Sequence, residues 1–273
     1  MIDAFLGHID ACPTPAHVVK RASELLNGSG FDRVSLESAF TSGHLEHGYV
    51  TRGGTIIAWR NAQTLSTNGI RIVGAHTDSP GLHIKTKPDT QTLNWQQLQV
   101  EVYGGPLLNS WLDRDLAIAG HVVLRDGTTS LFSSHHPVAR IPQLAIHLDR
   151  EISERGLVLD RQQHMNPVWG LNAPSFKEWL LSITGVHAVA YDAHLFDVSP
   201  AQLVGNKQEF LASARLDNQV SCWAAVEALA TSQSSDDSYI IVLNDHEEVG
   251  SESSRGAAGP LLSNIVSRIA DQH

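Results

Sequence analysis

The sequence predicts an α/β fold interrupted by a β-rich segment, and three observations lead to this prediction. Two nearly continuous apolar runs, at residues 70–76 and 239–244, are typical of buried parallel strands. Segments with apolar residues at helical spacing accompany these runs near both ends of the chain. Between Pro88 and Pro200, short β-like stretches alternate with turn signals instead. We therefore expect one α/β domain divided by an inserted β-rich domain.

The first part of the divided domain, residues 1–87, begins with two predicted helices. Apolar residues recur at helical spacing over 2–11 and 16–26, and the sequence NGSG ends the second helix. Predicted strands follow at residues 34–38, 48–52, 55–60 and 70–76. Gly53 and Gly54 join the second and third of these strands in a hairpin.

The inserted domain, residues 88–200, and the last part, residues 201–273, differ in pattern. Within the insertion, β-like segments lie at residues 98–104, 117–125 and 185–198. In the last part the α/β pattern returns, with a strand at 208–214, a helix at 216–232, a buried strand at 239–244 and a helix over 257–273.

Composition excludes several classes of protein. The 273 residues carry 29 acidic and 19 basic side chains, and this net charge of −10 argues against a basic face for nucleic acid. Apolar runs fall short of the about 18 residues that a membrane helix needs, and the N-terminus lacks a signal-peptide pattern, so we expect a soluble cytoplasmic protein. Cys12 and Cys222 are too few for a disulfide framework. The 15 histidines favour a metalloenzyme, although most of them, such as His135 and His136, are expected in surface loops.

The first candidate site is the sequence HTDSPG at residues 76–81, directly after a predicted strand. His76 would point into the crevice where open α/β sheets bind ligands. Asp78 would hydrogen-bond the imidazole and fix its tautomer, as a supporting group does for a metal-bound histidine. The alternative is a turn in which Asp78 and Ser79 bond main-chain groups before Pro80.

The second candidate is Asp217, which follows one predicted strand and precedes a predicted helix. We expect it at the same sheet edge as His76. The alternative is a helix N-cap, and the two roles are compatible because a carboxylate has two oxygens.

The third candidate is DHEEVGS, residues 245–251, after the buried strand at 239–244. Adjacent acids at the end of a buried strand need positive charge nearby, which a divalent cation supplies; the alternative is a solvated acidic loop. Glu247 and Glu248 point in different directions in extended chain, so one can hold metal while the other moves a proton from water. Together with His76 and Asp217 they form a mixed nitrogen and oxygen set that suits zinc, manganese or cobalt, singly or as a pair bridged by a carboxylate.

Five blocks of sequence resemble a known family. In order they are VGAHTDSPGLHIK, YGGPLLNSWLDRDLAIAGHVVL, RIPQLAIHLDR, ARLDNQVSCWAAVEAL and NDHEEVGSESSRGA. They resemble the aspartyl aminopeptidase family of dinuclear metallopeptidases. The resemblance implies a three-layer, zinc-peptidase-like α/β catalytic domain, incomplete at its C-terminus, with residues 88–200 as an inserted dimerisation and lid domain.

The same resemblance implies roles for individual residues. His76 and Glu248 would bind metal, Asp217 would bridge two divalent cations, most commonly zinc, Glu247 would be the general base, and Asp78 would support His76. His147 would reach the active site of a neighbouring subunit. The family also implies a dimer within a shell of twelve subunits, and a peptide with a free N-terminus as substrate.

Relative to the family the chain is expected to be truncated at its C-terminus, where relatives carry two further metal ligands. His83, His246 and His273 are the histidines that could take the place of those two ligands.

The leading hypothesis is a metal-dependent aminopeptidase that prefers N-terminal Asp or Glu. The alternative is a non-catalytic family member that acts as an assembly or binding module, and a third is a hydrolase that uses only the carboxylates of Glu247 and Asp217.

Overall fold

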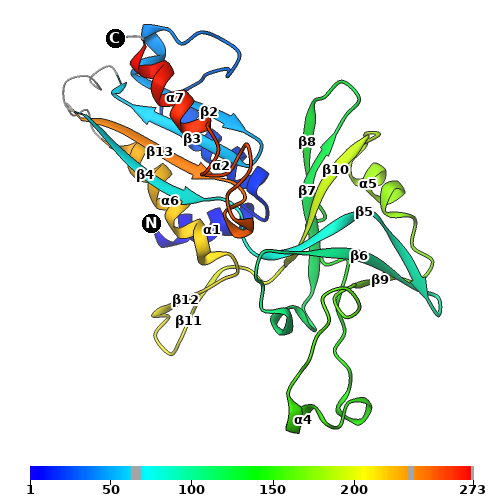
Figure 1. The fold of residues 1–273 in the computed structure, drawn as a ribbon. Coiled ribbons are helices and arrows are strands. Elements are labelled where there is room, and N and C mark those ends of the chain that lie inside the picture. The colour runs from blue at the N-terminus through cyan, green and yellow to red at the C-terminus, as the bar shows by residue number, and fades with distance from the viewer. Residues whose placement is uncertain (63–68, 233–236, 272–273) are drawn as a thin grey trace. The chain divides into compact units, whose positions relative to one another are not determined.

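The computed structural model describes residues 1–62, 69–232 and 237–271, and the chain folds into two compact units (Figure 1). The first unit combines Met1–Ser79 with Pro200–His273, and the second unit is Pro80–Ser199. Sequence analysis places the start of the insertion at residue 88. The second unit begins earlier, because strand β5 (Gly81–Thr92) pairs within its sheet from its first residue.

The first unit is built on a mixed β-sheet. Over the described residues its strand order is β1 (Asp32–Arg33), β2 (His47–Arg52), β3 (Thr55–Arg60), β13 (Ser238–Asn244) and β4 (Ile70–His76). Within the described residues, the α-helices of the unit are α1 (Ile2–Ala11), α2 (Pro15–Gly28), α6 (Leu216–Thr231) and α7 (Leu261–Ala270). Strand β13 runs antiparallel to β3 and parallel to β4, so β4 and β13 end at the same edge of the sheet.

Helices cover both faces of this sheet, and the alternation of apolar residues along β13 shows how. Ile241 and Leu243 pack in one core with residues of α2 and α6. Ile240 and Val242 pack in a second core with residues of α7. Because successive strand residues point to opposite faces, the two cores lie on opposite sides of the sheet. The expected three-layer α/β arrangement is confirmed.

Local sequence signals account for several boundaries in the first unit. Gly53 and Gly54 form the loop of the β2–β3 hairpin, as predicted, and Gly53 has the positive φ of 59° that such a turn favours. Pro15 stands at the first position of α2, where its missing N–H costs nothing. In the part of the chain that the structure describes, no helix combines the length and apolar character needed to cross a membrane.

Two predicted strands of the first unit differ from the structure. Residues 34–38 form a turn rather than a strand, because Ser35 Oγ accepts the Glu37 N–H at 3.2 Å and turns the chain just after β1. Strand β4 exists as predicted but is not buried, since Ile72 and Val73 are 45% and 52% exposed. Over the described residues β4 lies at the edge of the sheet, paired on one side with β13.

The second unit is built on a β-sheet in which every neighbouring pair is antiparallel. Over the described residues its order is β8 (Thr129–Ser133), β7 (Leu116–Val123), β10 (Ala190–Asp197), β5, β6 (Trp95–Tyr103) and β9 (Val168–Gly170). Its short helices are η3 (Leu108–Trp111), η4 (Ile146–Leu148), α4 (Ile152–Arg155) and α5 (Phe176–Thr184). The sheet buries its own core, which includes Leu98, Ile118 and Leu195.

Helix α5 was not predicted from the sequence. Its N-terminus is a capping box, in which Ser175 accepts the Glu178 N–H and Glu178 accepts the Ser175 N–H at 2.9 Å. Gly185 ends the helix in the left-handed conformation. Phe176 and Leu180 bury this helix against the core of the second sheet.

Candidate metal centre

The edge of the first sheet where β4 and β13 end carries two of the predicted motifs. His76 is the last residue of β4 and pairs in register with Asn244, the last residue of β13. The sequence DHEE follows Asn244 directly, with Glu247 and Glu248 in the short helix η5 (Glu247–Val249). Parallel pairing of the two strands therefore places His76 and the two glutamates at one edge. Strands β4 and β13 lie side by side in Figure 1.

Asp217 reaches this edge by a different route from the one expected. The predicted strand at 208–214 is only β12 (Phe210–Ala212), which pairs with β11 (Gln202–Val204) in a separate hairpin rather than joining the main sheet. Asp217 lies in the first turn of α6 and forms a cis peptide bond with Asn218. The expectation of three strand ends in one sheet is therefore wrong for Asp217, which a helix start supplies.

The side chains meet around the His76 imidazole. His76 Nε2 lies 3.2 Å from Asp217 Oδ1 and 4.0 Å from Glu247 Oε2. On the other side of the ring, Nδ1 lies 3.1 Å from the main-chain oxygen of Asp78 and 3.3 Å from its Oδ1. His76 is buried, whereas the Asp217 and Glu247 side chains are 84% and 54% exposed. Solvent therefore reaches the side of the ring that carries Nε2.

Asp78 connects the two strand ends. Its Oδ1 accepts the Glu247 N–H at 3.2 Å, and its Oδ2 accepts the Glu248 N–H at 3.1 Å. Asp78 is 1% exposed, so these bonds form in a water-poor environment. In the turn alternative, Asp78 bonds main-chain groups close to it in sequence. The main-chain groups that it bonds in the structure belong to Glu247 and Glu248, which are far away in sequence. The Asp78 carboxylate contacts the imidazole at the same time.

Further buried hydrogen bonds hold the main chain around His76. Cys222 Sγ donates to the His76 carbonyl oxygen at 2.9 Å, and Gln219 Nε2 donates to the Thr77 carbonyl oxygen at 3.0 Å, both from α6. Thr77 Oγ1 donates to the Gly54 carbonyl oxygen at 2.7 Å. The backbone around His76 is therefore fixed by two separate segments, α6 and the β2–β3 loop.

Charge is concentrated at this edge. Burial lowers the pKa of His76, but the hydrogen bond and charge of Asp78 and the charge of Glu247 outweigh it and raise the pKa to about 9. Burial raises the pKa of Glu248, and the charges of Asp78, Glu247 and Asp217 add to this effect while His76 opposes it. Several carboxylates crowd one imidazole here, an arrangement that a divalent cation would stabilise.

The donor set fits a metal ion. One ligand atom each from His76, Glu247 and Glu248 lie within 4.8 Å of one another. Asp217 Oδ1 adds a carboxylate oxygen beside His76 Nε2. Imidazole nitrogen and carboxylate oxygen are the ligands that zinc and its neighbours in the periodic table accept.

The alternatives for the acidic residues can be compared with the structure. Arg215, not Asp217, occupies the N-cap position of α6. Glu247 is exposed, as the solvated-loop alternative expects, whereas Glu248 is partly buried. The preceding acid, Asp245, is 4% exposed, and the sequence pattern does not single it out. Its Oδ2 lies 3.5 Å from Arg255 Nη1, and burial raises the pKa of its carboxyl despite the nearby positive groups.

The other histidines named from the sequence lie elsewhere. His246 Nδ1 is 2.8 Å from Ser253 Oγ and its Nε2 is 3.5 Å from Asp245 Oδ2, so this side chain is engaged beside the candidate centre rather than in it. His83 and His147 belong to the second unit, His147 on η4 with an exposed side chain. His273 lies outside the described residues.

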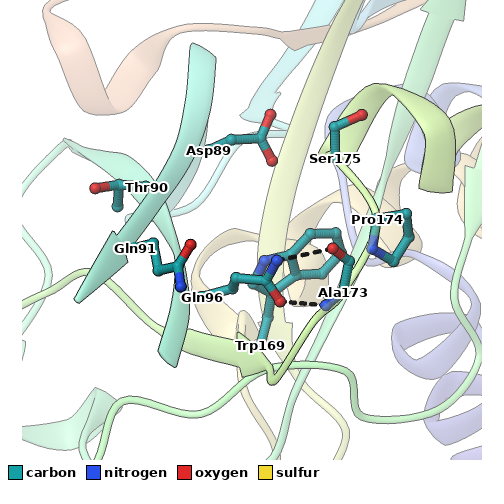
Figure 2. Close-up of a pocket in the computed structure, with 8 residues that line it drawn as sticks. All are labelled: Asp89, Thr90, Gln91, Gln96, Trp169, Ala173, Pro174 and Ser175. Atoms are coloured by element: carbon teal, nitrogen blue, oxygen red, sulfur yellow. Dashed lines mark hydrogen bonds between the residues drawn. The ribbon is translucent and has the colours of Figure 1, made fainter. Parts of the chain in front are cut away.

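The second unit also has an open surface hollow of about 390 Å³ (Figure 2). Two of its polar side chains bond nearby main-chain groups. Gln96 donates to the Ala173 carbonyl oxygen at 2.8 Å and accepts the Ala173 N–H. Asp89 accepts the Phe176 N–H at 2.8 Å at the start of α5. These bonds fasten a loop to the sheet, and the hollow has the character of a structural junction.

Comparison with known proteins identifies the family. Residues 8–273 match the aminopeptidase I zinc metalloproteases, family M18. The chain belongs to peptidase family M18. A probable M18 family aminopeptidase 2 of Streptomyces avermitilis is 44% identical to it over 280 residues, which are 97% of this chain and 64% of the relative. The chain thus spans less than two thirds of the length of that M18 relative.

Solved M18 structures have the same fold. The structure of Chaetomium thermophilum mApe1 superimposes with a TM-score of 0.91 at 28% identity, over 99% of this chain and 67% of that one. The S. cerevisiae mApe1 dodecamer gives a TM-score of 0.81 at 26% identity, over 99% of this chain and 66% of that one. The family resemblance and the fold class predicted from the sequence are therefore both confirmed.

Proposed function

We propose that this M18 chain is a metal-dependent aminopeptidase that hydrolyses the N-terminal residue of peptides. The observation that carries the proposal is the contact of His76 Nε2 with Asp217, beside Glu247 and Glu248, at a strand edge organised by Asp78. Membership of a family of zinc metalloproteases supports it independently.

His76, Asp217 and Glu248 are the residues proposed to hold the metal, with Asp217 as the carboxylate shared between two ions. Asp217 suits this role because its side chain is exposed and approaches His76 with one oxygen. When bound, a divalent ion such as zinc acts as a Lewis acid that lowers the pKa of water and polarises the peptide carbonyl.

Glu247 is the proposed general base. Its carboxylate is half-exposed and lies 4.0 Å from His76 Nε2, so it reaches both solvent and the metal-holding side of the ring. It would accept a proton from the attacking water at Oε2 and return it to the leaving amine. Asp78 is a positioning residue, because it fixes the main chain of Glu247 and the ring of His76 without facing solvent.

A test of the general base compares Glu247→Gln with Glu252→Gln, a matched change at an exposed glutamate nearby. We expect Glu247→Gln to lower kcat/KM by about 10²–10⁴-fold, the usual contribution of a general base, while zinc content stays unchanged. Glu252→Gln should keep full activity. A chelator should abolish the activity of wild type and of Glu252→Gln. Equal activity of Glu247→Gln and wild type would contradict the proposal.

The preferred substrates are proposed to carry N-terminal Asp or Glu. The support is the resemblance of the five sequence blocks to aspartyl aminopeptidases. Fluorogenic amides of Asp, Glu, Ala and Leu, supplied with zinc, manganese or cobalt, test the preference. Higher kcat/KM for Ala or Leu would contradict the acidic preference while leaving the aminopeptidase proposal standing.

We propose further that the second unit mediates self-association. Its η4 region exposes Leu144, Ile146 and Leu148, each at least 59% accessible, around His147. Exposed apolar residues of this kind are typical of interaction surfaces. The similarity to a dodecameric M18 structure supports the same conclusion.

Analytical ultracentrifugation of wild type and Ile146→Asp tests this surface, with Thr129→Asp as an exposed control in the same unit. We expect Ile146→Asp to dissociate the oligomer and Thr129→Asp to leave it intact.

Metal analysis distinguishes the proposed enzyme from the alternative, a non-catalytic binding module. An assembled protein that binds less than one zinc ion per chain and lacks peptidase activity would support the module.

A further inference from the structure

The second sheet carries a cluster of histidines around one aspartate. His83 on β5 pairs in register with His194 on β10, and Asp192 on β10 pairs with His121 on β7. Register partners and residues two apart along a strand share a face of a sheet, so these four side chains project from the same face. The other face is apolar at these strands, where Leu82, Ala193 and Val122 are buried in the core.

Three of these side chains converge. His194 Nε2 lies 3.0 Å from Asp192 Oδ1, and His83 Nδ1 lies 3.9 Å from the same oxygen. One ligand atom from each of His83, Asp192 and His194 lie within 4.8 Å of one another. A tetrahedral ion with bonds of about 2.0–2.1 Å separates its ligand atoms by roughly 3.3 Å. Small side-chain rotations are therefore enough to complete such a set.

The surroundings favour this geometry. The Tyr103 ring stacks on His83 with centroids 4.3 Å apart and planes 8° apart, which limits rotation of the imidazole. The ring centroids of His83 and His194 are 3.7 Å apart, so both imidazoles are close enough to serve one ion. Their side chains are 22% and 14% exposed, whereas Asp192 is 45% exposed and leaves a path to solvent.

The charge of Asp192 is also suitable. Burial alone would raise the pKa of its carboxyl, but the hydrogen bond from His194 and the charges of His194, His83 and His121 outweigh it and lower the pKa. The carboxylate therefore remains an anion at neutral pH. The nearby cation on β5, Lys85, lies 3.6 Å from Glu101 Oε2 and so has a carboxylate partner of its own. A metal ion bound at Asp192 would therefore meet an ionised carboxylate.

We propose that His83, Asp192 and His194 form a second metal site, which binds a divalent transition-metal ion of the zinc class. Two imidazole nitrogens and one carboxylate oxygen suit zinc, cobalt or nickel, whereas magnesium and calcium prefer all-oxygen sets. Three protein ligands leave a position for water. The site uses none of the residues proposed for the peptidase centre, so the two proposals can fail independently.

The ion would clamp a short junction of the second sheet. Within the described residues, β10 and β5 share two register pairs, His194–His83 and Leu195–Leu82. Between β10 and β7 there are eight. A metal ion held by both strands adds a cross-link where the hydrogen-bonded ladder is short, and binding to the folded state alone stabilises it.

The test uses the purified protein with the peptidase centre disabled by His76→Asn and Glu248→Gln. After chelator treatment, zinc is titrated against a chromophoric chelator, and cobalt is followed by its visible absorption. In separate titrations, we expect one zinc ion or one cobalt ion to bind per chain. We also expect zinc to raise the Tm of the protein. Adding His83→Asn or His194→Asn should weaken zinc binding by more than the about 10–100-fold that loss of a supporting group costs.

Controls make the result decisive. His187→Asn, at an exposed histidine of the same unit, should leave zinc binding unchanged, and magnesium or calcium should not replace zinc. His194→Cys keeps a zinc ligand and should bind zinc even if His194→Asn fails to fold. Zinc affinity that is the same with His83→Asn, or that falls equally with His187→Asn, would overturn the proposal.

Discussion

Asp78 Oδ2 lies 3.1 Å from the main-chain nitrogen of Glu248, and Asp78 Oδ1 lies 3.2 Å from that of Glu247. One buried carboxylate therefore satisfies two successive N–H groups of the segment that follows β13. The same carboxylate contacts the imidazole at the end of β4. The position of Glu248 relative to His76 thus depends on a third residue, and metal affinity should be sensitive to it.

Asp78→Asn tests this dependence. The amide keeps the size of the side chain but replaces one acceptor oxygen with a donor, so one of the two N–H groups loses its partner. We expect zinc affinity to fall by about 10–100-fold, as it does for supporting groups of metal ligands. We also expect a stability loss of about 1–3 kcal/mol for the unsatisfied buried group. Competition with a chromophoric chelator and urea unfolding measure the two effects.

Asp3→Asn, at an exposed aspartate in the first turn of α1, is the matched control and should change neither quantity appreciably. Wild-type zinc affinity in Asp78→Asn would show that the bonds to Glu247 and Glu248 do not position the ligands.

Much of the fold followed from periodicity in the sequence, and the failures have local causes. The run at 239–244 is buried on both faces as β13, because helices cover both sides of the sheet there. The equally apolar run at 70–76 forms β4, which is exposed. The apolar content of a strand shows that it can be buried, but it does not show which neighbouring segments cover it. Helix α5 was missed although Ser175 and Glu178 have the spacing of a capping box.

The proximity of the candidate residues was predictable, but their connections were not. Strand-end positions predicted that His76 and the glutamate pair lie at one edge, and they do so because β4 and β13 are parallel neighbours. The roles of these residues, and that of His147, stay predictions. The bonds from Asp78 to the glutamate amides join segments distant in sequence, and no local pattern encodes them. The cluster of His83, Asp192 and His194 was missed for a similar reason, since it depends on the register of β5 against β10.

Both cysteines should be unreactive in the folded protein. Burial raises the pKa of Cys12 and of Cys222 to about 12, and the thiolate is the form that reacts with disulfide reagents. Ellman's reagent should therefore modify neither thiol in native protein and both after denaturation. Ser267→Cys, at an exposed position of α7, supplies a positive control with one rapidly reacting thiol. Rapid labelling of native wild type would contradict the buried positions of both residues.

Gly120 should be intolerant of a side chain. A Cβ at this position of β7 would lie 1.9 Å from the Asp192 carbonyl oxygen on β10, and backbone cannot move aside as a flexible side chain can. We expect Gly120→Ala to lower the free energy of unfolding by about 1–3 kcal/mol through overpacking. Among the described residues no heavy atom lies within 4 Å of a Cβ built on Gly105, so Gly105→Ala is the control. Urea denaturation of both variants checks the difference, and equal stability would contradict it.

His8 should make the protein lose stability in mild acid. Burial lowers its pKa from 6.5 to about 4, an effect that the neighbouring Gln219 side chain only partly opposes and that the charge of Arg21 reinforces. As the pH falls below 6.5, the unfolded chain binds a proton at this histidine and the folded chain does not until about pH 4. Stability is therefore lost across this window as pH falls, and His8 contributes about 3 kcal/mol to the loss.

Urea unfolding between pH 7 and pH 4 measures this contribution in wild type and in His8→Gln, which cannot take up the proton. The stability of His8→Gln should fall less steeply with decreasing pH, because its unfolded state binds one proton fewer. His187→Gln is the matched control, because it removes one histidine at an exposed position of the other unit and leaves His8 in place. Identical slopes for wild type and His8→Gln would mean that His8 titrates normally in the folded protein, and the depressed pKa would then be wrong.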